Sequence, residues 1–257
     1  MHRFLLVAIS VLFISKGFSQ GVWCAFDSEN EAKFNQLSIQ DQIKAEKDRK
    51  RIFSNAQIQH SKSGPIYTIP TVIHVIHDDC DGNISMEQIR EGMRILNEDF
   101  RRQNSDTINT RPIFQGVAAD AEIQFVLANL DPNGNCTEGV VRVNSPLTNS
   151  ASPRDAVKSV SYWNSSKYFN IWLVNSIESS GSVGTILGYA QFPYFGSSST
   201  YGLVCRHDEW SNIGTATGAS ARGRVPSHEV GHCLGLYRTF QGSCGSNCNN
   251  SGDEICD

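Results

Sequence analysis

Apolar residues recur along this chain with two different periods, and these periods predict strands and helices. The stretches expected to form strands are residues 66–76, 122–130, 169–174, 188–193 and 201–206. The third of these is apolar except for Asn170, and it is expected to be a largely buried strand. The fourth is expected to lie at the edge of a sheet, because Pro193 limits pairing beyond it.

Two helices are expected beside these strands. Ser85 to Gln88 reads Ser-Met-Glu-Gln, a capping box that opens a helix, and apolar residues then recur at steps of three and four. A second helix is expected over residues 225–235, after most of the strands. This order predicts a mixed α/β domain. The apolar positions of the first helix are Met86, Ile89, Met93, Leu96 and Phe100.

The N-terminal part of the chain differs in composition from the rest. A basic start at Arg3, an apolar run and small residues predict a secretory signal peptide over residues 1–19, rather than an ordinary N-terminal strand or helix. Residues 20–63 are polar, have little apolar content for a core and carry a basic cluster that invites proteolysis. We interpret them as a helical or loosely ordered pro-segment, with a solvated surface helix as the alternative. Residues 64–257 are then expected to form one domain.

Charge and cysteine content narrow the partners and the compartment. Without residues 1–19, which carry Arg3 and Lys16 but no acidic residue, the formal net charge of −4 becomes −6. This mild acidity argues against nucleic acid as a partner, and no apolar run approaches the length of a membrane span. All eight cysteines follow the signal peptide, and an exported chain can keep disulfides. We therefore expect a secreted, extracellular protein with no membrane or nucleic-acid partner.

The stretch from His228 to His232 reads His-Glu-Val-Gly-His and is the strongest chemical signal in the chain. On a helix its two imidazoles lie one turn apart on one face, so both reach a single Zn²⁺. Glu229 between them can act as general base on a metal-bound water. Gly235 lets the chain turn sharply out of the helix. The competing interpretation is an amphipathic core helix that carries two surface histidines.

Further blocks of sequence carry a family resemblance. With them the chain resembles the pappalysin (pregnancy-associated plasma protein-A-like) metallopeptidases of the metzincin clan, most of all their bacterial secreted branch, over about residues 65–257. The resemblance implies an α/β (α+β) metzincin-type zincin domain with a mixed twisted sheet, a backing helix and an active-site helix. It also implies an edge strand near residues 187–192, on which an extended peptide adds as a further strand. Besides the zinc motif, the blocks are residues 66–77, 96–101, 187–190 and 252–253.

Two departures from the family pattern bear on activity. The family's third zinc ligand aligns with Arg238, whose guanidinium has no lone pair to donate. Even with this side chain turned into solvent, the coordination position lacks a ligand, whereas a catalytic zinc normally has three from the protein. The methionine-containing turn expected later is missing, so we interpret the C-terminal subdomain as truncated. Asp253, Glu254 or Asp257 is an alternative oxygen ligand, although such acidic residues more often bind structural Ca²⁺ or cap the fold.

The resemblance also gives the cysteines candidate roles. A pro-segment cysteine of the family can occupy the open zinc position and keep the zymogen silent. Cys24 matches in place, although Ala25 follows it where the family usually has Gly; a disulfide or a free thiol is the alternative. Cys233 is expected to pack in the core. The cysteines expected to staple a loop, rather than hold a structural zinc, are Cys244, Cys248 and Cys256.

These observations predict a secreted zinc metalloendopeptidase of the zymogen type, which hydrolyses peptide bonds with zinc-activated water and Glu229 as general base. His228 and His232 are its metal ligands, its substrates are proteins or peptides, and we expect a monomer. The alternative is a catalytically inactive metzincin-fold protein that binds peptides or proteins, because Arg238 replaces the third ligand. No Gly-x-Ser-x-Gly elbow supports a serine hydrolase. His74 and His77 face opposite sides of a strand and are taken as structural.

Overall fold

The computed structural model describes residues 24–56, 64–179, 184–218, 221–239, 241 and 252–254, with the backbone alone for residues 53–56. The predictions of a signal peptide, of a loop stapled by cysteines 244, 248 and 256, and of a role for Asp257 fall outside these residues. Within the described part of the chain, no helix is long and apolar enough to cross a membrane.

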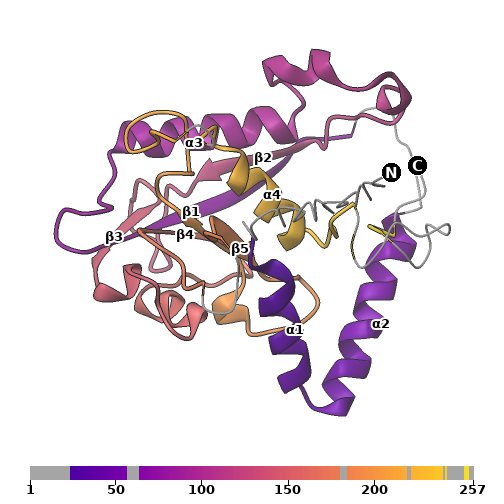
Figure 1. Ribbon diagram of the computed structural model, residues 1–257, viewed down its shortest axis with the longest axis horizontal. Helices are drawn as coiled ribbons and strands as arrows, with labels where there is room; N and C mark the ends of the chain where they lie inside the picture. The colour runs from indigo at the N-terminus through magenta and orange to yellow at the C-terminus, as the bar shows by residue number, and fades with distance from the viewer. Residues whose placement is uncertain are drawn as a thin grey trace, which may run out of the picture.

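Among the described residues, a mixed six-stranded sheet organises the chain (Figure 1), as the α/β interpretation predicts. Its strands are β1 (Tyr67–His77), β2 (Ile123–Leu127), β3 (Val140–Asn144), β4 (Phe169–Val174), β5 (Gly188–Ala190) and β6 (Leu203–Arg206). They follow the order β2-β1-β4-β6-β5, and β3 also pairs with β1. The strands of this sheet pair in parallel, except that β5 runs antiparallel to β6 at one edge.

Two helices, α3 (Met86–Phe100) and α4 (Arg224–Cys233), pack on one face of the sheet. Helix α3 begins at the predicted capping box, where the hydroxyl of Ser85 accepts a hydrogen bond from the backbone N–H of Gln88 at 3.1 Å. Helix α4 is tied to α3 because Asp99 accepts hydrogen bonds from the side chains of Arg224 and Ser227. Helix α4 is therefore held by α3 on one side and by β5 and β6 on the other.

Apolar side chains pack on both faces of the sheet. Under α3 and α4, Ile73 and Ile171 of the sheet meet Val230 of α4 in the larger core. On the opposite face, Trp172 and Val204 pack against loops that contain short 3₁₀ helices. Strand β4 is buried along its whole length, including its polar residue Asn170, which agrees with the largely buried strand predicted for these residues. The 3₁₀ helices on the face opposite α3 and α4 include Pro146–Thr148 and Arg154–Val160. The other 3₁₀ helices among the described residues are Ser105–Asn109, Pro112–Phe114 and Ser198–Thr200.

The edge of the sheet at β2 is closed by a carboxamide. Asn97 of α3 donates a hydrogen bond from Nδ2 to the carbonyl of Phe125 at 2.9 Å and accepts one from the N–H of the same residue at 2.7 Å. The side chain thus pairs with the edge strand as a neighbouring peptide group would. An edge strand otherwise leaves such groups open to another chain.

The residues before the sheet form a helical hairpin of α1 (Phe26–Gln36) and α2 (Ile39–Ala56), with α1 beside β5 (Figure 1). The helical form expected for residues 20–63 is confirmed where the structure describes them. The expectation that this segment contributes little to a core is wrong, since Phe26 is 1% exposed and belongs to the larger core. The polar average of the segment conceals an apolar first turn that packs against the sheet.

Candidate metal centre

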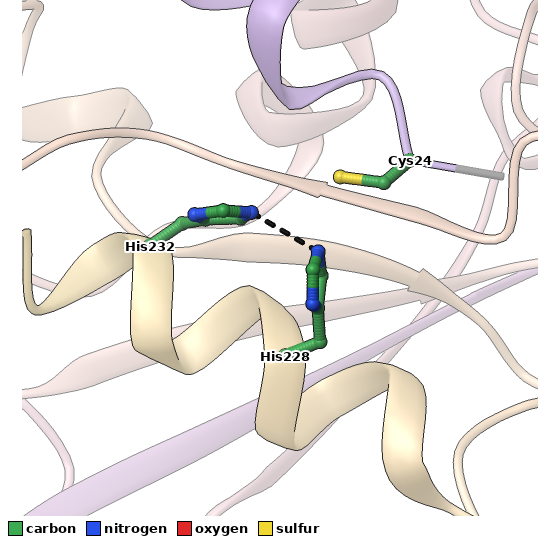
Figure 2. A group of neighbouring side chains, drawn as sticks. All are labelled: Cys24, His228 and His232. Carbon is green, nitrogen blue, oxygen red and sulfur yellow. Dashed lines mark hydrogen bonds between the residues drawn. The ribbon is translucent and has the colours of Figure 1, made fainter. Parts of the chain in front are cut away.

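The two histidines of the His-Glu-x-x-His stretch lie one turn apart on α4, and their Nε2 atoms are 3.1 Å apart. Residues 24–56, which precede the sheet, are called the N-terminal segment below. Figure 2 shows that the side chain of Cys24, at the start of this segment, points toward both imidazoles. The ligand atoms of Cys24, His228 and His232 all lie within 4.8 Å of one another. Within the described ranges, no other group of three His, Cys, Asp or Glu side chains is placed to hold a metal ion.

The donor set suits zinc, which prefers imidazole nitrogen and thiolate sulfur. The Nδ1 of His232 lies 2.7 Å from the carbonyl of Leu236, a hydrogen bond that puts the proton on Nδ1 and leaves the lone pair on Nε2. Two nitrogens on one tetrahedral zinc, with bonds of about 2.0–2.1 Å, are about 3.3 Å apart. The observed Nε2 separation of 3.1 Å is close to that value.

Both imidazoles are held in the neutral form that binds metal. Burial lowers the pKa of His232 to about 3, and its ring is stacked on that of Phe26 with centroids 3.7 Å apart. Burial, and then the nearby Arg238 cation, also lower the pKa of His228 below its ordinary value. No proton therefore needs to leave either ring before metal binds at neutral pH.

Glu229 is fully buried between the two histidines along α4. Burial raises the pKa of its carboxyl to about 8, while the neighbouring Cys24 and Arg238 pull it down. The carboxyl lies close to β5: a Cβ added to Gly188 would come within 3.0 Å of Cγ of Glu229. Glycine at this position lets strand and helix approach each other.

Arg238, in the third-ligand position, binds the N-terminal segment instead of solvent. Its Nη2 donates a hydrogen bond to the carbonyl of Cys24 at 3.0 Å, and its Nη1 lies 3.1 Å from a carboxylate oxygen of Asp27. The other oxygen of Asp27 accepts a hydrogen bond from Gln241. The alternative in which this arginine turns into solvent is therefore wrong, because an acidic partner in the first turn of α1 holds it.

The N-terminal segment occupies the outer edge of β5. The N–H of Ala25 donates to the carbonyl of Gly188 at 3.2 Å. Asn30, only 4% exposed, donates from Nδ2 to the carbonyl of Ala190 at 3.1 Å and accepts from the N–H of Phe192 at 3.2 Å. The outward polar groups of this edge are thus satisfied by the segment, as those of β2 are by Asn97.

Two ion pairs hold α1 farther along. Lys33 lies 2.6 Å from Asp155, and Glu29 lies 2.6 Å from Arg154. Asp155 also contacts the buried Lys158 at 2.9 Å. All of these side chains are largely shielded from solvent, so the pairs are less weakened by water and salt than exposed ones.

Comparisons with known proteins agree with this geometry. A family model described as pregnancy-associated plasma protein-A matches residues 153–257. The structure of mature mirolysin from Tannerella forsythia, in complex with a cleaved peptide, is similar at 36% identity and a TM-score of 0.68, covering 76% of this chain and 72% of that chain. The chain belongs to the pappalysin family. Its α/β fold is that of the mirolysin metzincins.

Two further relatives extend the comparison. A promirolysin variant from the same organism is 32% identical, with a TM-score of 0.73, and covers 89% of this chain and 73% of that chain. An extracellular metalloprotease of Pyricularia oryzae is 29% identical over 194 residues, which is 74% of this chain and 56% of the relative. The chain spans about half the length of the curated extracellular metalloproteases that it matches along most of its own length.

The structure also places the other candidate residues. His74 is structural as predicted, because its ring nitrogens lie 2.8 Å from Ser161 Oγ and 2.9 Å from Asn170 Oδ1. Cys233 is fully buried in the larger core, as predicted. Glu254 pairs with Arg49 at 2.6 Å, away from the metal ligands. Like Asp253, it does not join the described cluster, so neither supplies the oxygen ligand considered as an alternative.

Three residues of this pappalysin site escape sequence reasoning. Phe26, Asp27 and Asn30 stack on a ligand, bind Arg238 and pair with β5, respectively. Each lies in a segment whose average composition is polar, and their roles depend on partners far away in the sequence. These residues could have been found from their short sequence distance to Cys24. If Cys24 reaches the metal site, the residues that follow it must also lie along that site.

Proposed function

We propose that this chain is an exported zinc metalloendopeptidase that residues 20–63 keep latent. Residues 1–19 serve as its signal peptide, and residues 64–257 form the peptidase domain. The observation that carries the proposal is the convergence of Cys24 on His228 and His232. Two comparisons support it: promirolysin matches 89% of the chain against 76% for mature mirolysin, and curated relatives are named extracellular metalloproteases.

The histidines and Glu229 have separate roles in this proposal. His228 and His232 hold Zn²⁺, which when bound polarises a scissile carbonyl and makes a water acidic enough to attack it. Glu229 removes the proton of the attacking water and passes it to the leaving amine. Its place on α4 next to Gly188 puts the carboxyl directly below the edge of β5.

The substrate binds where the N-terminal segment now lies. When Ala25 and Asn30 leave, the outward groups of β5 become free to pair with another extended chain. Main-chain hydrogen bonds of this kind recognise a peptide without regard to most of its side chains. We therefore propose protein or peptide substrates, with the segment acting as a stand-in for them until it is removed.

One observation favours a second candidate function. Arg238 stands in place of the third ligand, so departure of Cys24 leaves two metal ligands among the described residues. A zinc site of that kind falls short of the usual three. The alternative is a protein that has kept the metzincin fold and binds a peptide or protein at β5 without cutting it.

The two candidates differ in whether the unmodified chain, like the variant Arg238→His, cleaves a protein once the segment is removed. A specific protease site inserted between residues 57 and 63 allows the segment to be cut from the folded chain and removed by gel filtration. We expect Arg238→His, treated in this way and loaded with zinc, to cleave casein. Adding Glu229→Gln is expected to lower that rate by about 10²–10⁴-fold, because the base is lost while the shape is kept. A zinc-loaded unmodified chain that leaves casein intact, while Arg238→His cleaves it, supports the binding protein instead.

A further inference from the structure

We propose that Cys24 is an obligatory zinc ligand of this chain, so that zinc and the N-terminal segment bind cooperatively. This inference rests on the proposed function in taking the metal to be zinc, and it implies that the chain freed of the segment holds zinc less tightly than the latent chain does. In this proposal Cys24 does more than block a zinc site that already has its three ligands. Here the thiolate belongs to the minimum set of ligands, and the metal and the segment hold each other.

The ligand count leads to this conclusion. Among the described residues, the cluster contains two imidazoles and one thiol, and the third-ligand position carries a guanidinium. With Cys24 the described residues supply the three ligands that a zinc site usually has, and without it they supply two. Asp253 and Glu254 stand outside the cluster, so in the described chain neither carboxylate replaces the thiol.

Arg238 strengthens the dependence of the metal on Cys24. By donating to the carbonyl of Cys24 and pairing with Asp27, it fixes the backbone at Cys24 and three residues after it. Arg238, which stands in the third-ligand position, thus positions the thiol of Cys24. When the segment leaves, the same guanidinium loses Asp27 as its counterion and stays beside the histidines as a cation, which disfavours Zn²⁺ there.

Linkage sets the size of the effect in both directions. Partners in the outer shell of a zinc site commonly change metal affinity by about 10–100-fold, and a direct ligand is expected to contribute at least as much. We therefore expect loss of the Cys24 thiol to weaken zinc binding by about 100-fold or more. By reciprocity, zinc favours the closed position of the segment by the same factor.

The test measures zinc affinity of the full chain after the signal peptide, by competition with a chromophoric chelator. Cys24→Ala is compared with Cys136→Ala, which removes an exposed free thiol. We expect about 100-fold weaker binding for the first variant and unchanged binding for the second. Zinc affinity within about threefold of the unmodified chain in Cys24→Ala overturns the proposal. Matching circular dichroism spectra of the metal-free chains ensure that folding is not the cause.

Two further measurements keep the inference testable if Cys24→Ala folds poorly. Cobalt in the unmodified chain is expected to show the near-ultraviolet thiolate-to-metal charge-transfer band; cobalt binding without that band overturns the proposal. In Cys24→Ala, adding Arg238→His is expected to recover zinc affinity to within about tenfold, since the ligand count returns to three. No recovery overturns the argument from ligand count. All of these readouts report metal binding, so a chain that passes them but never cuts a protein refutes only the peptidase activity.

Discussion

Replacing Asn30 by alanine should open the N-terminal segment. The change leaves the carbonyl of Ala190 and the N–H of Phe192 without their partner while α1 stays in place. An unpaired buried polar group costs roughly 1–3 kcal/mol, and both groups regain hydrogen bonds to water when the segment opens. The penalty therefore falls on the closed state. The lower value for each group gives about 2 kcal/mol, a roughly 30-fold shift toward the open form.

Alkylation of Cys24 reports this opening. With a chelator present, so that metal does not protect the thiol, its modification rate follows the open fraction when closing is faster than the reaction. Mass spectrometry locates the label, and the exposed thiol of Cys136 serves as an internal reference. We expect Asn30→Ala to raise the rate at Cys24 about 30-fold relative to Cys136. The matched control is Asn35→Ala, which changes an exposed asparagine on the same helix.

The comparison between Asn30→Ala and Asn35→Ala shows whether the hydrogen bonds of Asn30 to the edge of β5 hold the N-terminal segment closed. If the rate at Cys24 in Asn30→Ala is within about threefold of that in Asn35→Ala, the edge of β5 does not hold the segment. In that case the ion pairs of α1 with Arg154 and Asp155 are the remaining anchors to test.

Two further predictions concern the scaffold. Burial lowers the pKa of His74 from 6.5 to about 4, so its contribution to stability is complete above pH 6.5 and is lost as the pH falls toward 4, by up to about 3 kcal/mol. Urea unfolding across this range should show a shallower pH dependence for His74→Gln, and an unchanged slope would contradict the assignment. A Cβ on Gly92 would meet Trp210 at 2.1 Å. Gly92→Ala should therefore lose about 1–3 kcal/mol despite the helix preference of alanine, and a higher melting temperature would refute this packing.

The sequence predicts best those elements whose cause is local. Strand β4 has the predicted ends, because five of its six residues are apolar and the strand is buried on both faces of the sheet. Helix α3 begins after Ser85, where its cap is written in the next three residues. His228 and His232 lie one turn apart on α4, as their spacing predicts. In each case the interaction that decides the structure lies within a few residues of the pattern.

The elements that sequence reasoning misses depend on distant partners. Strand β3 (Val140–Asn144) is short, and its place is fixed by pairing in parallel with β1, more than sixty residues earlier. The fate of Arg238 is decided by Asp27, and the burial of Asn30 by the edge of β5. No periodicity records such pairings. The predicted helix 225–235 also ends early, at Cys233, because the turn at Gly235 takes a left-handed φ of 98°.

Because of Phe26, it matters whether the N-terminal segment is present while the rest of the chain folds. It lies in the larger core, edge-to-face with Phe192 and stacked on His232. A chain synthesised from residue 64 onward must find its fold without that ring, whereas a chain cut after folding need only survive its loss. A slow rate of unfolding can preserve the second product under conditions in which the first never forms. The same peptidase domain can thus be long-lived or unobtainable, according to whether residues 20–63 were present when it folded.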